Sequence, residues 1–151
     1  MKKAFIVILL SLTIILLLSL CLFHFQGKKN ITIQTADGQQ VKYQVELART
    51  PEQQQKGLMN RTKLAPNTGM LFLFSPNRVA HMWMKDTLIP LDMVFFDRKG
   101  HVIHVHTNAK PQDETVISSI RPVAGVLEIN AGEATKYNID LDSILNLKNI
   151  K

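Results

Sequence analysis

Beyond residue 29, apolar and polar positions alternate mainly with the two-residue period of β-strands. Residues 31–35 and 41–47 both alternate in this way, and the Asp37-Gly38 pair between them favours a tight turn. The two segments therefore predict an N-terminal β-hairpin. The same criteria predict further strands at residues 70–74, 79–84, 91–96, 101–107, 123–129 and 143–147.

Two short helices interrupt this strand pattern. Thr50 can cap a helix whose first residue is Pro51, and Gln53 completes a capping box, which predicts a helix to about Met59. Residues 133–137 predict one or two further helical turns. Because most successive strands are close in sequence, the sheet should be largely antiparallel. We expect a β-rich α+β domain of about seven strands at residues 30–147, barrel-like or sandwich-like, followed by a frayed tail at residues 148–151.

The N-terminus has a different pattern. Residues 4–25 form an apolar run interrupted only by two Ser, one Thr and one His. At 1.5 Å per residue this run spans about 33 Å as a helix, which matches a hydrocarbon core of about 30 Å. No small-residue cleavage pattern precedes Gly27, so a retained transmembrane anchor within residues 1–29 is favoured over a cleaved signal peptide. Lipidation at Cys21 is the lesser alternative.

The charge distribution supports an anchored domain. Lys2, Lys3 and the α-amino group precede the apolar run and two lysines follow it, which favours a periplasmic, extracytoplasmic domain. Four of the 18 basic residues lie within residues 1–29, which hold no acidic residue, so the net charge falls from +6 to +2 for residues 30–151. We therefore expect no nucleic-acid partner. The single Cys rules out a disulfide framework within the chain.

Two carboxylates occur in apolar surroundings. Asp92 lies in the apolar segment 91–96, and Glu128 lies between Leu127 and Ile129. Such a group must either face solvent or be buried with a partner. One interpretation is structural: Asp92 would hold the loop before it, and Glu128 would pair with Arg61. The other is a cleft that binds a polar ligand and is lined by Arg61, Lys85, Thr87, Asp92 and Glu128.

Two further clusters contain metal-ligating residue types. His101, His104 and His106 fit a solvated edge strand better than a metal site, which would need a third ligand on one face. The segment His81-Met82-Trp83-Met84 carries imidazole and thioether groups, which suit Cu(I). Methionine more often fills core space, so no metal or other cofactor is expected.

Four segments together resemble the domain-of-unknown-function 192 family over about residues 31–145. They are Gly57-Leu-Met-Asn-Arg61, Gly69-Met-Leu-Phe72, residues 83–92 and residues 126–132. The resemblance implies a small, often exported or membrane-tethered prokaryotic protein with a compact β-rich fold. The five cleft candidates match the family's signature polar positions, but the resemblance implies no reaction or ligand.

The expected function is a membrane-tethered extracytoplasmic domain that binds a small polar or anionic ligand, or a cell-envelope component, without catalysis. One alternative is a hydrolase or isomerase that uses Asp92 and Glu128 as an acid/base pair. Another is a periplasmic copper-handling protein that uses His81, Met82 and Met84. The sequence leaves open whether the protein is an enzyme, and also its oligomeric state.

Overall fold

The computed structural model describes residues 27–148 and 150. Residues 1–26, which include most of the predicted anchor and Cys21, lie outside the described residues. Residues 149 and 151 of the predicted tail lie outside them as well. Within the described part of the chain, no helix has the length and apolar character needed to span a membrane.

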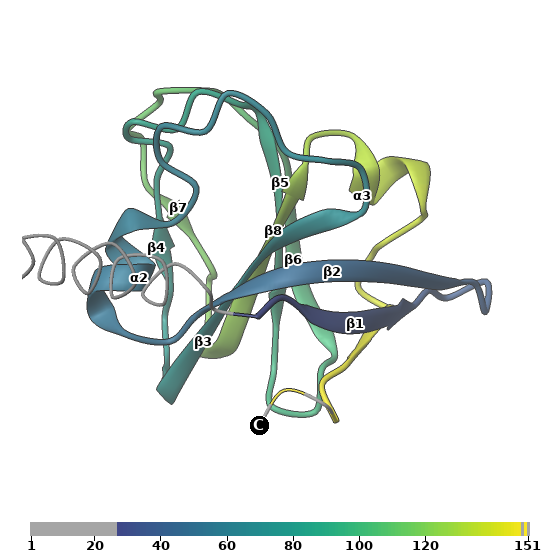
Figure 1. Cartoon of the computed structure of the whole chain (residues 1–151). Helices are drawn as coiled ribbons and strands as arrows, with labels where there is room; N and C mark the ends of the chain where they lie inside the picture. The colour runs from purple at the N-terminus through teal and green to yellow at the C-terminus, as the bar shows by residue number, and fades with distance from the viewer. Residues whose placement is uncertain (1–26, 149, 151) are drawn as a thin grey trace, which may run out of the picture.

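Seven strands form one sheet, and two more pair in a separate short ribbon (Figure 1). The order in the sheet is β6-β5-β8-β3-β2-β1-β9, and β4 pairs with β7. Helices α2 (Pro51–Lys56) and α3 (Glu133–Lys136) complete the fold, which confirms the β-rich α+β class. The strands are β1 (Lys29–Gln34), β2 (Gln40–Ala48), β3 (Thr68–Arg78), β4 (His81–Met82), β5 (Leu91–Phe96), β6 (Val102–Ala109), β7 (Ile117–Ser118), β8 (Val123–Asn130) and β9 (Ile144–Asn146).

Most of the predicted elements are confirmed. The β1–β2 hairpin is present, and Thr50 and Gln53 form the reciprocal capping box of α2, which ends before Gly57, earlier than predicted. The sheet is antiparallel except for β2 and β3, which pair in parallel through a crossover that contains α2. The predicted strand at residues 79–84 is reduced to two residues, because the Met84 N–H bonds to the Asp113 carbonyl (2.9 Å) rather than to a strand neighbour.

The sheet curls until its two edges meet at one end, which favours a half-barrel over a sandwich (Figure 1). His101 forms an isolated bridge with Ile144 of β9, and the Leu145 N–H donates to the Gly100 carbonyl at 2.8 Å. Gly100 has a φ of +88°, and a Cβ at this position would lie 2.0 Å from the Leu145 carbonyl oxygen. Glycine is therefore required where the sheet closes.

The two faces of the sheet carry separate apolar cores. The first includes Tyr43, Leu71, Val94 and Leu127 and packs against Ala134 of α3. The second includes Phe72, Met93 and Val126, and it is covered by Leu58 and by segments from residue 80 to 89. Because side chains alternate along a strand, neighbouring residues of β5 and β8 belong to different cores. Every residue of β5 is buried, since both faces are covered.

Candidate functional site

A cavity of about 360 Å³ opens on the second face of the sheet, between α2 and the β4 segment. A small ligand pocket typically has this size. The cavity is brought together by hydrogen bonds between distant loops: the Asn60 N–H donates to the Asp86 carbonyl (2.7 Å), and the Gln112 N–H to the Thr87 carbonyl (3.1 Å). Its lining residues are Pro51, Gln54, Gln55, Lys56, Gly57, Leu58, Met59, Phe72, Phe74, Arg78, His81, Met82, Trp83, Thr87 and Glu128.

Glu128 provides the buried acidic group of this cavity. Strand β8 lies inside the sheet between β5 and β3, and Glu128 lies opposite Met70 of β3 and Met93 of β5, so its side chain has buried neighbours on both sides. The residue is 4% exposed, and within residues 27–148 and 150 its carboxyl forms no hydrogen bond or ion pair. Burial raises the pKa of Glu128 to about 8 because the ionised form loses its hydration. The group is therefore mostly protonated at neutral pH.

Thr87 is the second predicted residue that lines the cavity. It is buried, and its hydroxyl donates to the Lys85 carbonyl at 3.2 Å. The donor is thereby used, while the lone pairs of the hydroxyl oxygen can accept a hydrogen bond. Thr87 can therefore act as an acceptor toward a ligand in the cavity.

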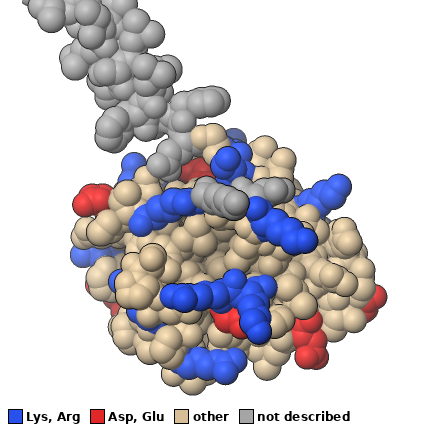
Figure 2. Space-filling view, turned by 90° about the horizontal axis from the view of Figure 1, so that it is seen from below, with Lys and Arg blue, Asp and Glu red and all other residues tan. Residues whose placement is uncertain are grey.

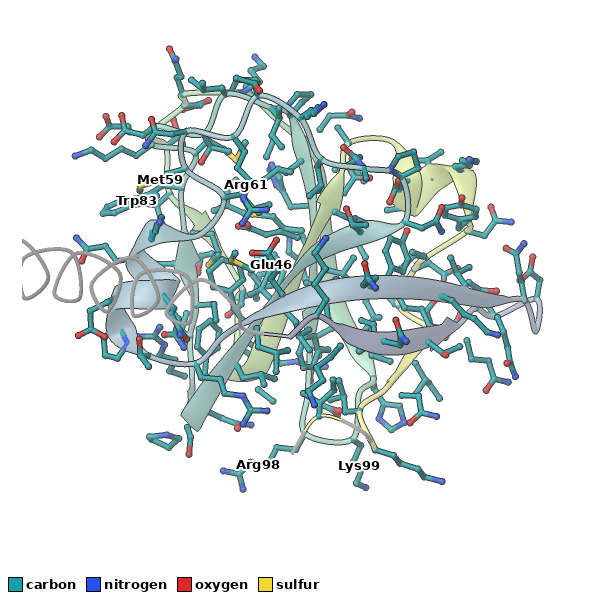
Figure 3. The ribbon with its side chains drawn as sticks, viewed as in Figure 1. Glu46, Met59, Arg61, Trp83, Arg98 and Lys99 are labelled. Atoms are coloured by element: carbon teal, nitrogen blue, oxygen red, sulfur yellow. The ribbon has the colours of Figure 1, made fainter. Side chains whose placement is uncertain are left out.

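The walls of the cavity are aromatic and thioether side chains. Phe72 and Phe74 come from β3. Trp83, the only tryptophan in the chain, is 47% exposed, which is unusual for such a large aromatic side chain. Figure 3 shows Met59 and Trp83 near one another at this side of the molecule. An exposed aromatic ring beside a cavity is the usual platform for the flat or apolar body of a ligand.

Arg61 pairs with Glu46, which corrects the predicted pairing with Glu128. The guanidinium donates to both carboxylate oxygens, at 2.7 and 2.6 Å (Figure 3). These hydrogen bonds lower the pKa of Glu46. Glu46 is in register with Met70, which is in register with Glu128, so both acids face the same side of the sheet. Two strand spacings place their backbones about 10 Å apart.

Asp92 faces the first core, on the opposite side of the sheet from Glu128. Met93, its neighbour in β5, is in register with Glu128, so alternation directs Asp92 the other way. Asp92 is 0% exposed and accepts backbone N–H groups from Asn108 and Ala134, each at 2.9 Å. It fixes the end of β6 and the first turn of α3, so its role is structural. The expectation that it holds the loop before β5 is wrong, because its hydrogen bonds among the described residues come from these two backbone N–H groups.

Only two of the five predicted residues therefore share the cavity. Lys85 is exposed and does not line the cavity. Arg61 is not among the lining residues either, and its guanidinium is paired with Glu46. Since Asp92 and Glu128 lie on opposite faces, they cannot divide acid and base roles on one substrate. The geometry does not support the predicted hydrolase or isomerase pair.

The copper candidates are also separated by the fold. Met84 is 1% exposed in the second core, whereas His81 and Met82 line the cavity. Met59, which is not one of the predicted copper ligands, lines it as well. His104 packs on Phe95, and burial lowers its pKa. No group of three or more His, Cys, Asp or Glu residues that could hold a metal occurs in the described part of the chain.

A separate basic surface lies at the end of the molecule where β5 turns into β6. Figure 2 looks onto this end and shows Lys and Arg side chains gathered there. Arg98, Lys99 and Lys148 are exposed and line a pocket of about 490 Å³ beside β9. The Arg98 guanidinium donates to the side chain of Asn77 at 2.9 Å, and Figure 3 shows Arg98 and Lys99 at this end.

The described residues form a β-rich α+β domain, with a cavity on one face of its curled sheet. Residues 32–147 match the family model DUF192, described as "Uncharacterized ACR", and the chain belongs to this family. The predicted family resemblance is confirmed.

Two solved structures are similar over most of their length. A Sinorhizobium meliloti protein, provisionally described as a transcription regulator, has 42% identity and a TM-score of 0.78, with 80% of this chain and 93% of that chain covered. A protein of unknown function from Novosphingobium aromaticivorans has 37% identity and a TM-score of 0.77, with 82% and 89% covered. No curated protein matches the chain.

Proposed function

We propose that this domain binds a small polar ligand in the cavity that contains Glu128, without catalysis. One observation carries the proposal: the four segments that resemble the family are separate in sequence, and each contributes lining residues to this cavity. They supply Gly57 to Met59, then Phe72, then Trp83 and Thr87, and finally Glu128. Packing of a core would not require these segments to meet around an open space.

The chemistry of the lining supports binding. Burying a carboxyl group without a partner lowers the stability of the fold. Destabilising groups of this kind are commonly found where a side chain binds a ligand. Glu128 and Thr87 present polar atoms among apolar walls, which is the usual composition of a ligand pocket. Glu128 has no second carboxylate in the lining, so binding is favoured over acid/base chemistry.

We further propose that the domain works on the extracytoplasmic side of a membrane, held there by residues 1–29. The apolar N-terminal run and its flanking lysines support this. A ligand drawn from the cell envelope would then be available at the site. The transcription-regulator description belongs to the Sinorhizobium protein, and the modest charge of residues 30–151 gives no support for its transfer here.

The test is a fragment screen followed by amide chemical shifts of the ¹⁵N-labelled fragment 27–151. Binding should shift the indole N–H of Trp83 and the amides of residues 57–59 and 128 with a common dissociation constant. Trp83→Ala should weaken every hit, whereas the control Val116→Ala, at an exposed residue outside the lining, should not. Saturable shifts confined to another surface, or no saturable shift from a chemically broad library, would contradict the proposal.

A second candidate function is supported by Met59. With Met82 and His81 it gives the cavity two thioethers and an imidazole, a donor set that favours Cu(I) and Ag(I). Silver(I) titration followed by methionine methyl shifts tests this. Coincident movement of Met59 and Met82, lost in Met59→Leu, would support metal handling, and unmoved methyl resonances would exclude it.

A further inference from the structure

The charged groups of the cavity are distributed unevenly between its deep part and its mouth. Glu128 is buried on the interior strand β8, whereas Lys56, at the end of α2, and Arg78, at the end of β3, are exposed. The side chains of Phe72, Phe74 and Trp83 line the space as well. The cavity therefore has an acidic interior, apolar walls and a basic mouth.

The deep part fits an amino group. Glu128 has no cationic partner among the described residues, so an ammonium group that enters this desolvated place would stabilise the ionised carboxylate, which the free cavity disfavours. An ammonium has three donors and no acceptor. The Glu128 carboxylate can accept one of them. The Thr87 hydroxyl can accept another, because its own hydrogen is directed to the Lys85 carbonyl.

The mouth fits an anionic group. The Arg78 guanidinium stacks over the Phe74 ring at 4.4 Å and donates to Gln54 Oε1 at 2.9 Å. These two contacts hold the guanidinium plane in place, while its other N–H groups stay available for a carboxylate or phosphate. Lys56 adds a second positive charge to the same mouth.

We propose that the cavity selects a zwitterionic ligand, with an amino group toward Glu128 and Thr87, an anionic group toward Arg78 and Lys56, and an apolar body against Trp83. This inference rests on the proposed function and narrows its ligand class. A purely anionic ligand would leave the buried carboxyl without a partner, and a purely cationic one would meet only like charge at the mouth.

Three compounds with one aromatic body test the inference on the full-length chain. 4-(Aminomethyl)benzoate carries both groups, 4-methylbenzylamine only the amine, and 4-methylbenzoate only the carboxylate. Binding is followed by the fluorescence of Trp83, the only tryptophan, and by calorimetry. We expect the zwitterion to bind about 10-fold or more tightly than either single-charge compound, since one charge-assisted hydrogen bond is worth about that factor.

Variants assign each end of the ligand. Glu128→Gln should reduce the affinity of the zwitterion to that of 4-methylbenzoate, and Arg78→Gln should reduce it to that of 4-methylbenzylamine. The matched controls Glu114→Gln and Arg98→Gln change exposed residues outside the lining and should leave all three affinities unchanged.

The pH profile gives an independent readout. Amine binding requires Glu128 to release its proton, so the affinity for the zwitterion should rise between about pH 6 and 8 in the wild type and stay flat in Glu128→Gln. Lys56, Arg78 and His81 also face this space, and of the three His81 is the residue type that titrates near neutral pH. The pH measurements are therefore repeated with His81→Gln, in which the affinity should still rise with pH. The inference would be overturned if the affinity for the zwitterion no longer rose with pH in His81→Gln but still rose in Glu128→Gln.

The failure of this inference is distinguishable from that of the proposed function. If 4-methylbenzoate bound as tightly as the zwitterion, the inferred selectivity for zwitterionic ligands would be wrong. The cavity would still be a ligand site. The absence of binding by all three compounds at millimolar concentration would also overturn it, while the fragment screen described above separately decides whether the cavity binds any ligand.

Discussion

Replacing Glu128 with Gln should stabilise the domain, and increasingly so as the pH rises. The side chain keeps its shape and some hydrogen-bonding capacity, but it no longer titrates. In the wild type, burial raises the pKa of Glu128 from 4.5 to about 8 in the folded state. A raised folded-state pKa contributes stability that is fully present below the unfolded-state pKa and is lost as the pH rises through the folded-state value.

The size of the effect follows from the two pKa values. Each unit of difference corresponds to 1.36 kcal/mol, so the window between 4.5 and about 8 amounts to roughly 5 kcal/mol of unfolding free energy. At pH 7 about 3 kcal/mol of this should already be lost. Glu128→Gln avoids the loss. Its advantage over wild type should therefore be near its minimum at pH 4.5, about 3 kcal/mol larger at pH 7 and about 4 kcal/mol larger at pH 9.

Urea unfolding of fragment 27–151 at pH 4.5, 7 and 9 measures this difference directly. Two variants serve as controls. Glu114→Gln, at an exposed acid, should follow the wild type. Glu46→Gln should instead be less stable than the wild type by a nearly constant amount at all three pH values, because hydrogen bonds from Arg61 lower the pKa of Glu46 and its contribution is lost only below about pH 4.5. If the unfolding free energies of Glu128→Gln and wild type differed by the same amount at all three pH values, the claim that Glu128 is a buried, unpaired carboxyl would be refuted.

Three further predictions concern stability and processing. Asp92→Asn should lower the unfolding free energy by about 2–4 kcal/mol, because the new NH₂ faces one of two backbone N–H donors; an unchanged urea midpoint would contradict this. Trp83→Ala should cost about 1 kcal/mol or less, since the ring is half-exposed, and a loss of 3 kcal/mol or more would place it in the core. Residues 1–29 should remain attached in the native host; an intact-mass measurement that finds a mature chain starting between Leu20 and Asn30 would refute the anchor.

Local patterns predicted the elements but not how the two acids would be oriented. The hairpin and the capping box depend on residues within a few positions of one another, so the sequence contains them directly. Whether Asp92 and Glu128 share a face depends on the register of β5 against β8, which pairs Glu128 with Met93. Strands about 30 residues apart can pair in either register until tertiary packing selects one.

The cavity was predictable only in part for a similar reason. Glu128 is predictable as an acid in an apolar segment and Thr87 as a match to the family's polar positions, whereas Met59 and Phe74 look like ordinary core residues. Arg61 was identified as important, but its partner Glu46 belongs to an alternating strand in which an acid at a half-buried position is unremarkable. The parallel pairing of β2 with β3, which brings Glu46 next to Met70, has no local signal.

The central claim is that Glu128 is the buried, ligand-facing acid of the cavity, and the ¹³Cδ resonance of its side chain tests this most directly. A pH titration of that resonance in the free domain should give a pKa of about 8, and this pKa should fall when 4-(aminomethyl)benzoate or another amine-bearing ligand fills the cavity. A pKa near 4.5 in the free domain, together with a resonance that does not respond to any bound ligand, would contradict the account.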